Sequence, residues 1–408
     1  MKIILLIVVL INLVISSNGF KKSYNNFKVY RIIPKNKDQL NALKEIEQNP
    51  SYIFWNEVSY VNRSVDIMVP PILQNKFSKI LQNFEHKLWI KNVQDLIDNE
   101  NVVESKSTFD WHNYHDLDTI YDWLRYLSVY YPHVSLVNGG ISYENRTILG
   151  VKVSFKPGNK IIFLEAGIHS REWISSATVT YILNELLTSN DPAIQTIARS
   201  RDWYVFPNFN PDGYQYSRTK DRMWRKTRKP YGGCYGADPN RNWNYHWMDG
   251  GSSNWPCNDA FAGSSPFSEI ETKSLSHFIS GISYNIEAYI GFHSYSQVLM
   301  IPFGHAGLEV PANNVELKRI GNITATKLSE KYNTKYRVGN IPEVMYVGSG
   351  GSSDWVLGTN RHIPYVYTFE LRDQGKYGFL LPPDQIIPTG EETFDAVIAM
   401  MKEFDKKK

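Results

Sequence analysis

The sequence predicts an α/β protein with a mixed, largely parallel central sheet covered by helices, preceded by a small α+β domain. At 408 residues, with 42% apolar side chains, the chain exceeds one ordinary domain and can fill a large core. The first hundred residues alternate short apolar runs with polar helical stretches. After residue 108, Trp, Tyr, Gly and Pro become frequent, and apolar runs alternate with helical stretches, which is typical of a parallel sheet.

The first residues have the pattern of a signal peptide. One Lys precedes an apolar run over 3–15, and small polar residues follow it. A membrane anchor is the alternative, but the run contains Asn12 and is shorter than the roughly 20 apolar residues that span a bilayer. We therefore expect residues 1–19 to be a signal peptide, and the protein to be secreted and extracellular rather than bound to a membrane.

Residues 20–106 are expected to form a small α+β domain with its linker. Its segments follow the ferredoxin-like order strand, helix, strand, strand, helix, strand. These segments are 27–34, 38–48, 53–61, 65–71, 72–88 and 89–97. The polar stretch 98–107 is interpreted as a linker, in which Lys106 offers a basic cleavage point.

Residues 107–408 are expected to form the second domain. Strands are predicted over 161–166, 203–210, 287–294 and 365–371, and helices over 174–187 and 268–280. Sites in such folds lie beyond the carboxyl ends of the strands. The residues found at the ends of these runs are His169, Asn208, His293 and Glu370.

The charge and cysteine content narrow the class of protein. The formal net charge is only +3, from 44 basic and 41 acidic residues, so nothing indicates a nucleic-acid or acidic partner. In an oxidising compartment the two cysteines, Cys234 and Cys257, favour one disulfide, with two buried thiols as the alternative. Asn62, Asn145 and Asn322 begin glycosylation triplets, which indicates surface positions.

The segment EAGIHSREW, residues 165–173, is the first candidate for chemistry. His169 and Glu172 stand three apart on a turn that leads into a helix, so both side chains reach one side. A catalytic zinc takes three protein ligands and leaves a position for water, and His293 at another strand end is the candidate for the third. A solvated pair or a helix-start carboxylate is the alternative for an isolated HxxE.

Three other segments carry candidate residues. Glu370 ends a buried-looking run, where it could be a general base near a metal or an ion-pair partner of Arg372. Arg241 follows Asn240, and an arginine fork suits a carboxylate, with a structural salt bridge as the alternative. Tyr346 precedes a glycine-rich turn that could carry it over a site or be a plain surface loop.

Taken together, six motifs resemble those of the zinc carboxypeptidase family of the A/B type, in order and at compatible spacing. They are HSRE, DRMWRKTR, PNRNW, GFHSYSQ, YVGSGGSSDW and TFELRD. The front part of the chain is similar to the inhibitory propeptide of that family. The resemblance implies a secreted procarboxypeptidase, a monomer that binds one zinc ion, is activated by a trypsin-like protease and acts on the C-termini of peptides and proteins.

The resemblance also implies roles for single residues. His169, Glu172 and His293 would hold the zinc. Glu370 would activate the attacking water and pass its proton to the leaving amine, and Arg225 would stabilise the oxyanion. The terminal carboxylate of the substrate would be held by Asn240, Arg241 and Tyr346, with Arg171 assisting along the cleft. Cys234 and Cys257 match the paired cysteines of the family.

The specificity pocket departs from the family pattern at one position. Ser353 stands where A-type members have an aliphatic residue and B-type members an aspartate, and Asp354 aligns with an aspartate common to both types. The alignment lines the pocket with Met300, Gly304, Ile341, Gly348, Ser353 and Thr368. An uncharged pocket predicts apolar or aromatic C-terminal residues. Alternatives are a basic-residue carboxypeptidase, a deacylase of small acyl amino acids and a catalytically inactive binding protein.

Overall fold

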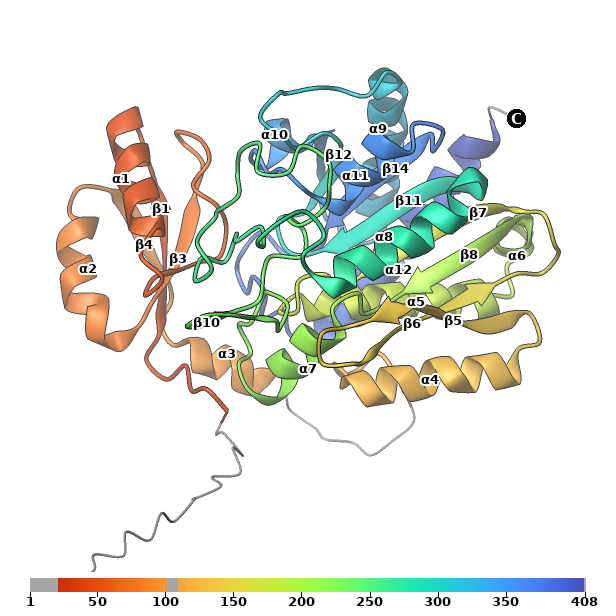
Figure 1. Cartoon of the computed structure of the whole chain (residues 1–408), viewed down its shortest axis with the longest axis horizontal. Coiled ribbons are helices and arrows are strands. Elements are labelled where there is room, and N and C mark those ends of the chain that lie inside the picture. Colours follow the sequence, from red (N-terminus) through yellow and green to blue (C-terminus); the bar gives the residue numbers. More distant parts are fainter. Residues whose placement is uncertain (1–20, 101–108, 407–408) are drawn as a thin grey trace, which may run out of the picture.

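The computed structural model describes residues 21–100 and 109–406, which form two units packed against each other (Figure 1). The predicted signal peptide and Lys106 lie outside the described residues. The smaller, N-terminal unit is built on a four-stranded sheet and the larger unit on an eight-stranded sheet. A further two-stranded ribbon belongs to the larger unit. The predicted fold class is confirmed for both units.

The smaller unit is an antiparallel sheet in the order β2-β3-β1-β4 with helices on one face. Ile32 and Ile67 pack under the helices with Leu43 and Phe77. The opposite face, with Val29, packs against the larger unit. The elements are β1 (Lys28–Ile33), α1 (Lys37–Glu47), β2 (Ile53–Phe54), β3 (Val65–Val69), the 3-10 turn η1 (Pro71–Leu73), α2 (Gln74–Leu81), β4 (Glu85–Ile90) and α3 (Val93–Asn99).

Three predictions in this unit are wrong at their boundaries. The strand expected over 53–61 ends at Phe54, because Trp55 turns away from the sheet and packs against the larger unit. The helix expected over 72–88 ends at Leu81. Residues 85–90 form an edge strand, and because most of its side chains are exposed, the sequence lacks the alternation of apolar and polar residues that marks a strand. The strand expected over 89–97 ends early, since Val93 and Ile97, four apart, bury one face of α3.

The larger unit carries a mixed sheet in the order β13-β12-β14-β11-β7-β8-β6-β5. The four central strands β8, β7, β11 and β14 are parallel, as predicted, and antiparallel pairing occurs toward the edges. The strands are β5 (Val134–Ile141), β6 (Thr147–Val153), β7 (Lys160–Ala166), β8 (Arg201–Phe206), β9 (Pro230–Tyr231), β10 (Cys234–Tyr235), β11 (Ile286–His293), β12 (Val298–Ile301), β13 (Arg337–Asn340) and β14 (Tyr365–Glu370).

Helices cover both faces of this sheet (Figure 1). On β7, Ile162 and Leu164 point to the core under α5, α9 and α12, whereas Ile161 and Phe163 point to the core under α8 and α11. This alternation follows from the two-residue period of a strand. The helices are α4 (Leu117–Tyr130), α5 (Trp173–Thr188), α6 (Pro192–Ser200), α7 (Pro211–Thr219), α8 (Ile270–Ile282), α9 (Asn314–Tyr332), α10 (Ile341–Val344), α11 (Ser352–Thr359) and α12 (Ile386–Asp405), with 3-10 turns η2 (Ser283–Asn285) and η3 (Pro383–Gln385).

The parallel strands bring the predicted site residues to one edge of the sheet. His293 and Glu370 are the last residues of β11 and β14 and lie side by side in register. His169 follows the end of β7, and Asn208 follows the end of β8. Within the described residues, no helix is both long and apolar enough to cross a membrane.

Candidate active site

Two imidazoles and one carboxylate meet beyond the ends of β7 and β11. Nδ1 of His169 lies 2.9 Å from Oε1 of Glu172 and 3.1 Å from Nδ1 of His293. Nδ1 of His293 lies 3.1 Å from Oε2 of Glu172. These distances are close to the edge, about 3.3 Å, of a tetrahedron whose metal–ligand bonds are about 2.0 Å long. All three side chains are buried, and their donor set and spacing fit a zinc ion.

The neighbouring side chains favour the ionised form of Glu172 and orient the ring of His169, and both effects suit the binding of a cation. Burial alone would raise the pKa of Glu172, but His169 and His293 lower it overall, well below its usual range. The ring of His169 is oriented from its other side by Asp238, whose Oδ1 lies 3.1 Å from Nε2. A carboxylate behind a histidine ligand fixes the tautomer and strengthens the ligand. Asp238 is absent from the residues predicted above.

Asp238 also connects the triad to Arg225. The Nε and Nη2 groups of Arg225 donate to Oδ2 of Asp238 at 3.0 and 2.7 Å, and Nη1 lies 3.8 Å from Oε1 of Glu172. Burial alone would raise the pKa of Asp238, but Arg225 and His169 lower it well below its usual range. Arg225, which is predicted to stabilise the oxyanion, is therefore held in a fixed position beside the triad.

Glu370 is a buried carboxyl next to the same group. Burial raises its pKa to about 8, Glu172 adds to the rise, and His293 opposes it. A cation held by the triad would lower this pKa again. The ion pair that Arg372 could have made with Glu370 is not formed, because Nε of Arg372 donates to Oε1 of Glu392 at 2.7 Å.

Arg241 lies close to the triad and is buried. Its Nε donates to the carbonyl of Gly251 at 2.9 Å, and its Nη2 donates to Oε1 of Glu57 in the smaller unit at 2.5 Å. The ring centroid of Tyr346 is 5.6 Å from the guanidinium carbon. Asn240 is fixed by the backbone N–H of Ser352, which donates to its Oδ1 at 2.9 Å. The predicted carboxylate-binding residues are therefore assembled at one place.

A disulfide between Cys234 and Cys257 joins the ends of the loop that carries Asp238, Asn240 and Arg241. The predicted pairing is confirmed. In the chain-entropy model a closed loop of this size stabilises the fold by about 3 kcal/mol. The bond therefore restricts the loop that positions both Asp238, the partner of His169, and the residues predicted to bind a carboxylate.

A small cavity continues from the triad past Arg241. Its walls include most of the predicted pocket: Met300, Ile341, Gly348, Ser353 and Thr368. Asp354 also lies in this wall, and its Oδ2 accepts a hydrogen bond from the backbone N–H of Gly304 at 2.7 Å. Burial raises the pKa of Asp354 to about 7. The charge of this carboxyl is therefore reduced near neutral pH.

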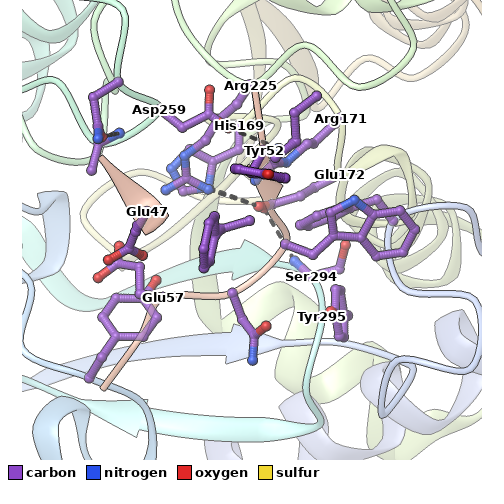
Figure 2. A pocket seen from close by; sticks show the side chains of 18 of the residues that line it. Glu47, Tyr52, Glu57, His169, Arg171, Glu172, Arg225, Asp259, Ser294 and Tyr295 are labelled. Atoms are coloured by element: carbon purple, nitrogen blue, oxygen red, sulfur yellow. Dashed lines mark hydrogen bonds and ion pairs between the residues drawn. The ribbon is translucent and has the colours of Figure 1, made fainter. Parts of the chain in front are cut away.

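The smaller unit covers the mouth of the site. Figure 2 shows Glu47, Tyr52 and Glu57 of that unit facing His169 and Arg171 across one pocket. Arg171 stacks over the ring of Phe379 at 4.2 Å and donates to Oδ2 of Asp259 at 3.2 Å. Burial raises the pKa of Glu57, and Arg241 opposes the rise. Glu57 is a site residue that sequence reasoning missed.

Two family models match the chain in the places that this geometry indicates. A model described as zinc carboxypeptidase matches residues 120–396, and one described as carboxypeptidase activation peptide matches residues 30–100. The chain belongs to the zinc carboxypeptidase family. Among named relatives, zinc carboxypeptidase A 1 of Anopheles gambiae is 46% identical over 391 residues, which is 93% of this chain and 90% of the relative. Carboxypeptidase B of Astacus astacus is 46% identical over 293 residues, 71% of this chain and 96% of the relative.

Solved structures extend the match to both units. Thrombin activatable fibrinolysis inhibitor is 29% identical, with a TM-score of 0.88 over 94% of this chain and all of that chain. Carboxypeptidase A from Helicoverpa armigera is 27% identical, with a TM-score of 0.85 over 93% of this chain and 98% of that chain. Both alignments cover the smaller as well as the larger unit.

This zinc carboxypeptidase carries its activation peptide and is therefore a zymogen. Its cofactor is zinc, for which His169, Glu172 and His293 form the binding group. The enzyme class predicted from the motifs is confirmed in place of the deacylase and inactive binding-protein alternatives. Its substrates are peptides, and the activation peptide implies that proteolysis activates it.

Proposed function

We propose that the protein is a secreted monomeric zymogen which, once residues 20–106 are removed, cleaves apolar or aromatic residues from the C-termini of peptides and proteins. The observation that carries this proposal is the buried Arg241 guanidinium between the metal triad and a cavity with mostly uncharged walls. Secretion is supported by the signal-peptide pattern of residues 1–19 and by the disulfide, which needs an oxidising compartment.

Zinc, when bound, supplies a Lewis acid that polarises the scissile carbonyl and makes a water more acidic. Glu370 takes the proton of the attacking water and delivers it to the leaving amine, a role that suits a buried carboxyl beside the triad. Arg225 donates to the carbonyl oxygen as that oxygen becomes negative. Its pairing with Asp238 holds the guanidinium in place before substrate arrives, so little reorganisation is needed.

Arg241 holds the terminal carboxylate of the substrate, with Asn240 and Tyr346 beside it. Support comes from Glu57, because a carboxylate of the chain itself already binds this guanidinium in the zymogen. A substrate carboxylate in the same place would form the same charge-assisted bond. Arg171 lies farther along the covered pocket, where the rest of the peptide would pass.

The same contact explains how the zymogen is kept inactive. Glu57 pairs with the Arg241 guanidinium, which the substrate carboxylate would otherwise bind. The smaller unit also covers the pocket above the triad. The unit is anchored elsewhere, since Glu100 pairs with the buried Arg222 and Asp66 accepts from the hydroxyl of Tyr295 at 2.9 Å. Cleavage near Lys106 by a trypsin-like protease would cut the covalent link, after which only non-covalent contacts of this kind hold the smaller unit.

We expect Glu57→Gln to raise the activity of the uncleaved chain toward a small blocked dipeptide by at least about tenfold. The change removes the negative charge that pairs with Arg241 and leaves at most a neutral acceptor, whereas a hydrogen bond between charged groups is worth about 1.5–3 kcal/mol. The matched control is Glu85→Gln, which removes an exposed carboxylate of the same unit that pairs with Lys35.

Limited trypsin digestion should then bring the wild type, Glu57→Gln and the Glu85→Gln control to the same activity, with a fragment that begins near Ser107. Equal activity of the uncleaved and trimmed wild-type proteins would contradict the zymogen mechanism. If uncleaved Glu57→Gln is no more active than the uncleaved wild type, Glu57 does not contribute to the inhibition.

Matched blocked dipeptides ending in Phe, Leu, Lys and Arg test the residue preference. We expect kcat/KM to favour Phe and Leu by roughly a thousandfold over Lys and Arg, because a buried cation without a carboxylate partner costs several kcal/mol. Ser353→Asp should raise kcat/KM for Lys and Arg, since it adds a carboxylate to the wall.

Basic-residue specificity is the second candidate, favoured by one observation: Oδ1 of the buried Asp354 has no hydrogen-bond partner among the described residues. Under that alternative the wild type would prefer Lys and Arg, and Asp354→Asn would abolish the preference. The pKa of Asp354 is about 7, so its carboxylate forms above that pH, and hydrolysis after Lys or Arg would rise as the pH increases through 7.

A further inference from the structure

A second group of metal-binding side chains lies outside the zinc triad, on two neighbouring loops of the larger unit. His246 belongs to the loop that follows Trp243, and His305 and Glu309 belong to the loop that follows β12. One ligand atom from each of His246, His305 and Glu309 lies within 4.8 Å of the others. The zymogen contacts and the catalytic residues described above do not use these side chains.

The two imidazole rings face each other. Their centroids are 3.7 Å apart and their planes differ by 5°. On one edge, Oδ2 of Asp249 lies 2.9 Å from Nδ1 of His246 and 3.6 Å from Nδ1 of His305. An Nδ1 proton of His246 directed at Asp249 leaves the Nε2 lone pair of that ring for an ion, the arrangement in which a carboxylate supports a histidine ligand.

His305 provides the independent observation that points to a ligand. The residue is 1% exposed, and within the described chain its Nε2 has no hydrogen-bond partner. Oε2 of Glu309, at 3.6 Å, is too distant for a hydrogen bond. A buried polar atom without a hydrogen-bond partner destabilises a fold, and a bound ion would provide the missing partner.

The two loops hold the group together before any ion arrives. The backbone N–H of Ala306 donates to the carbonyl of Asp249 at 2.9 Å. The ring of Tyr245 stacks on Phe303 at 5.4 Å, and its hydroxyl lies 3.3 Å from Oε2 of Glu309. The His246 side chain is 40% exposed, so an ion can reach it from solvent.

We propose that His246, His305 and Glu309 bind a second divalent transition-metal ion, of the class of zinc, with Asp249 supporting the imidazoles. Two imidazoles and one carboxylate suit zinc-class ions, whereas Ca²⁺ and Mg²⁺ prefer oxygen ligands alone. Binding requires the rings to turn out of their parallel stack, and the exposed His246 has room to turn. Binding through Nε2 also places the ring proton of His305 on Nδ1, facing Asp249 rather than the N–H of Gly307 that now lies 3.2 Å away.

The ion would fasten the loop that carries His246 to the loop that carries His305. The second of these loops begins next to the specificity cavity, because the N–H of Gly304 binds Asp354 in its wall. The proposed ion therefore stabilises the outer side of that wall and takes no part in the hydrolysis itself.

Zinc stoichiometry of the untagged full-length protein tests the proposal. The protein is loaded with one equivalent of zinc and titrated with Zn²⁺ by calorimetry, and bound metal is counted after dialysis. We expect two zinc ions per chain in the wild type. His246→Gln and Glu309→Gln should each bind the second ion at least about tenfold more weakly and keep the first.

The matched control is His362→Gln, which removes another exposed imidazole that stacks on a ring, that of Tyr284 at 4.9 Å. The control should keep both ions. One ion per chain in the wild type would overturn the proposal. So would a second ion that survives both His246→Gln and Glu309→Gln, since it would then bind somewhere other than the proposed site. Equal loss in the control would indicate non-specific binding to surface histidines and would also overturn it.

Discussion

Replacing Glu370 with glutamine is expected to lower kcat of the trimmed enzyme by about two to four orders of magnitude, the contribution of a general acid–base group. The amide is close to the carboxyl in shape but cannot take the proton of water. Because Glu370 is outside the metal-binding group of His169, Glu172 and His293, the variant should bind as much zinc as the wild type, and KM should change little.

The control for Glu370→Gln is Glu330→Gln, which removes an exposed carboxylate on α9 that pairs with Lys327. It should leave kcat unchanged. Nearly normal turnover in Glu370→Gln would exclude Glu370 from the chemistry. A variant that also loses zinc would show instead that the carboxyl stabilises the metal group.

Replacing Arg241 with alanine in the trimmed enzyme is expected to lower kcat/KM by about 30- to 5,000-fold. Truncating one partner of a buried, hydrogen-bonded charge pair costs about 2–5 kcal/mol. The trimmed enzyme is the right material, because in the zymogen the same change would also leave Glu57 buried without its partner. Arg241→Lys should recover only part of the loss, since lysine keeps the charge but not the planar fork.

The parts of this fold that follow from local periodicity could be predicted from the sequence. The apolar runs that became β7, β11 and β14 end where the strands end, and this placed His169, His293 and Glu370 at one edge of the sheet. The parallel order of the central strands then brings these residues together in space.

The contacts between distant segments could not be predicted in this way. Glu57 reaches Arg241 across 184 positions of the chain, and no period within either segment encodes that contact. Asp238 stands two positions before Asn240. Its place just ahead of the Asn240-Arg241 pair is the one feature of the sequence that could have indicated a role for it in the site. Edge strand β4 was misassigned because an exposed strand can keep charged residues on both faces.

Hydrolysis of one blocked dipeptide as its free acid and as its C-terminal amide, by the trimmed wild-type enzyme, tests the central claim most directly. If Arg241 binds the terminal carboxylate, the amide leaves a buried guanidinium without its partner. We expect kcat/KM to be at least about a hundredfold higher for the free acid, and this ratio to fall toward one in Arg241→Ala. Comparable rates for the acid and the amide in the wild type would contradict the account, because the site would then not select a C-terminal carboxylate.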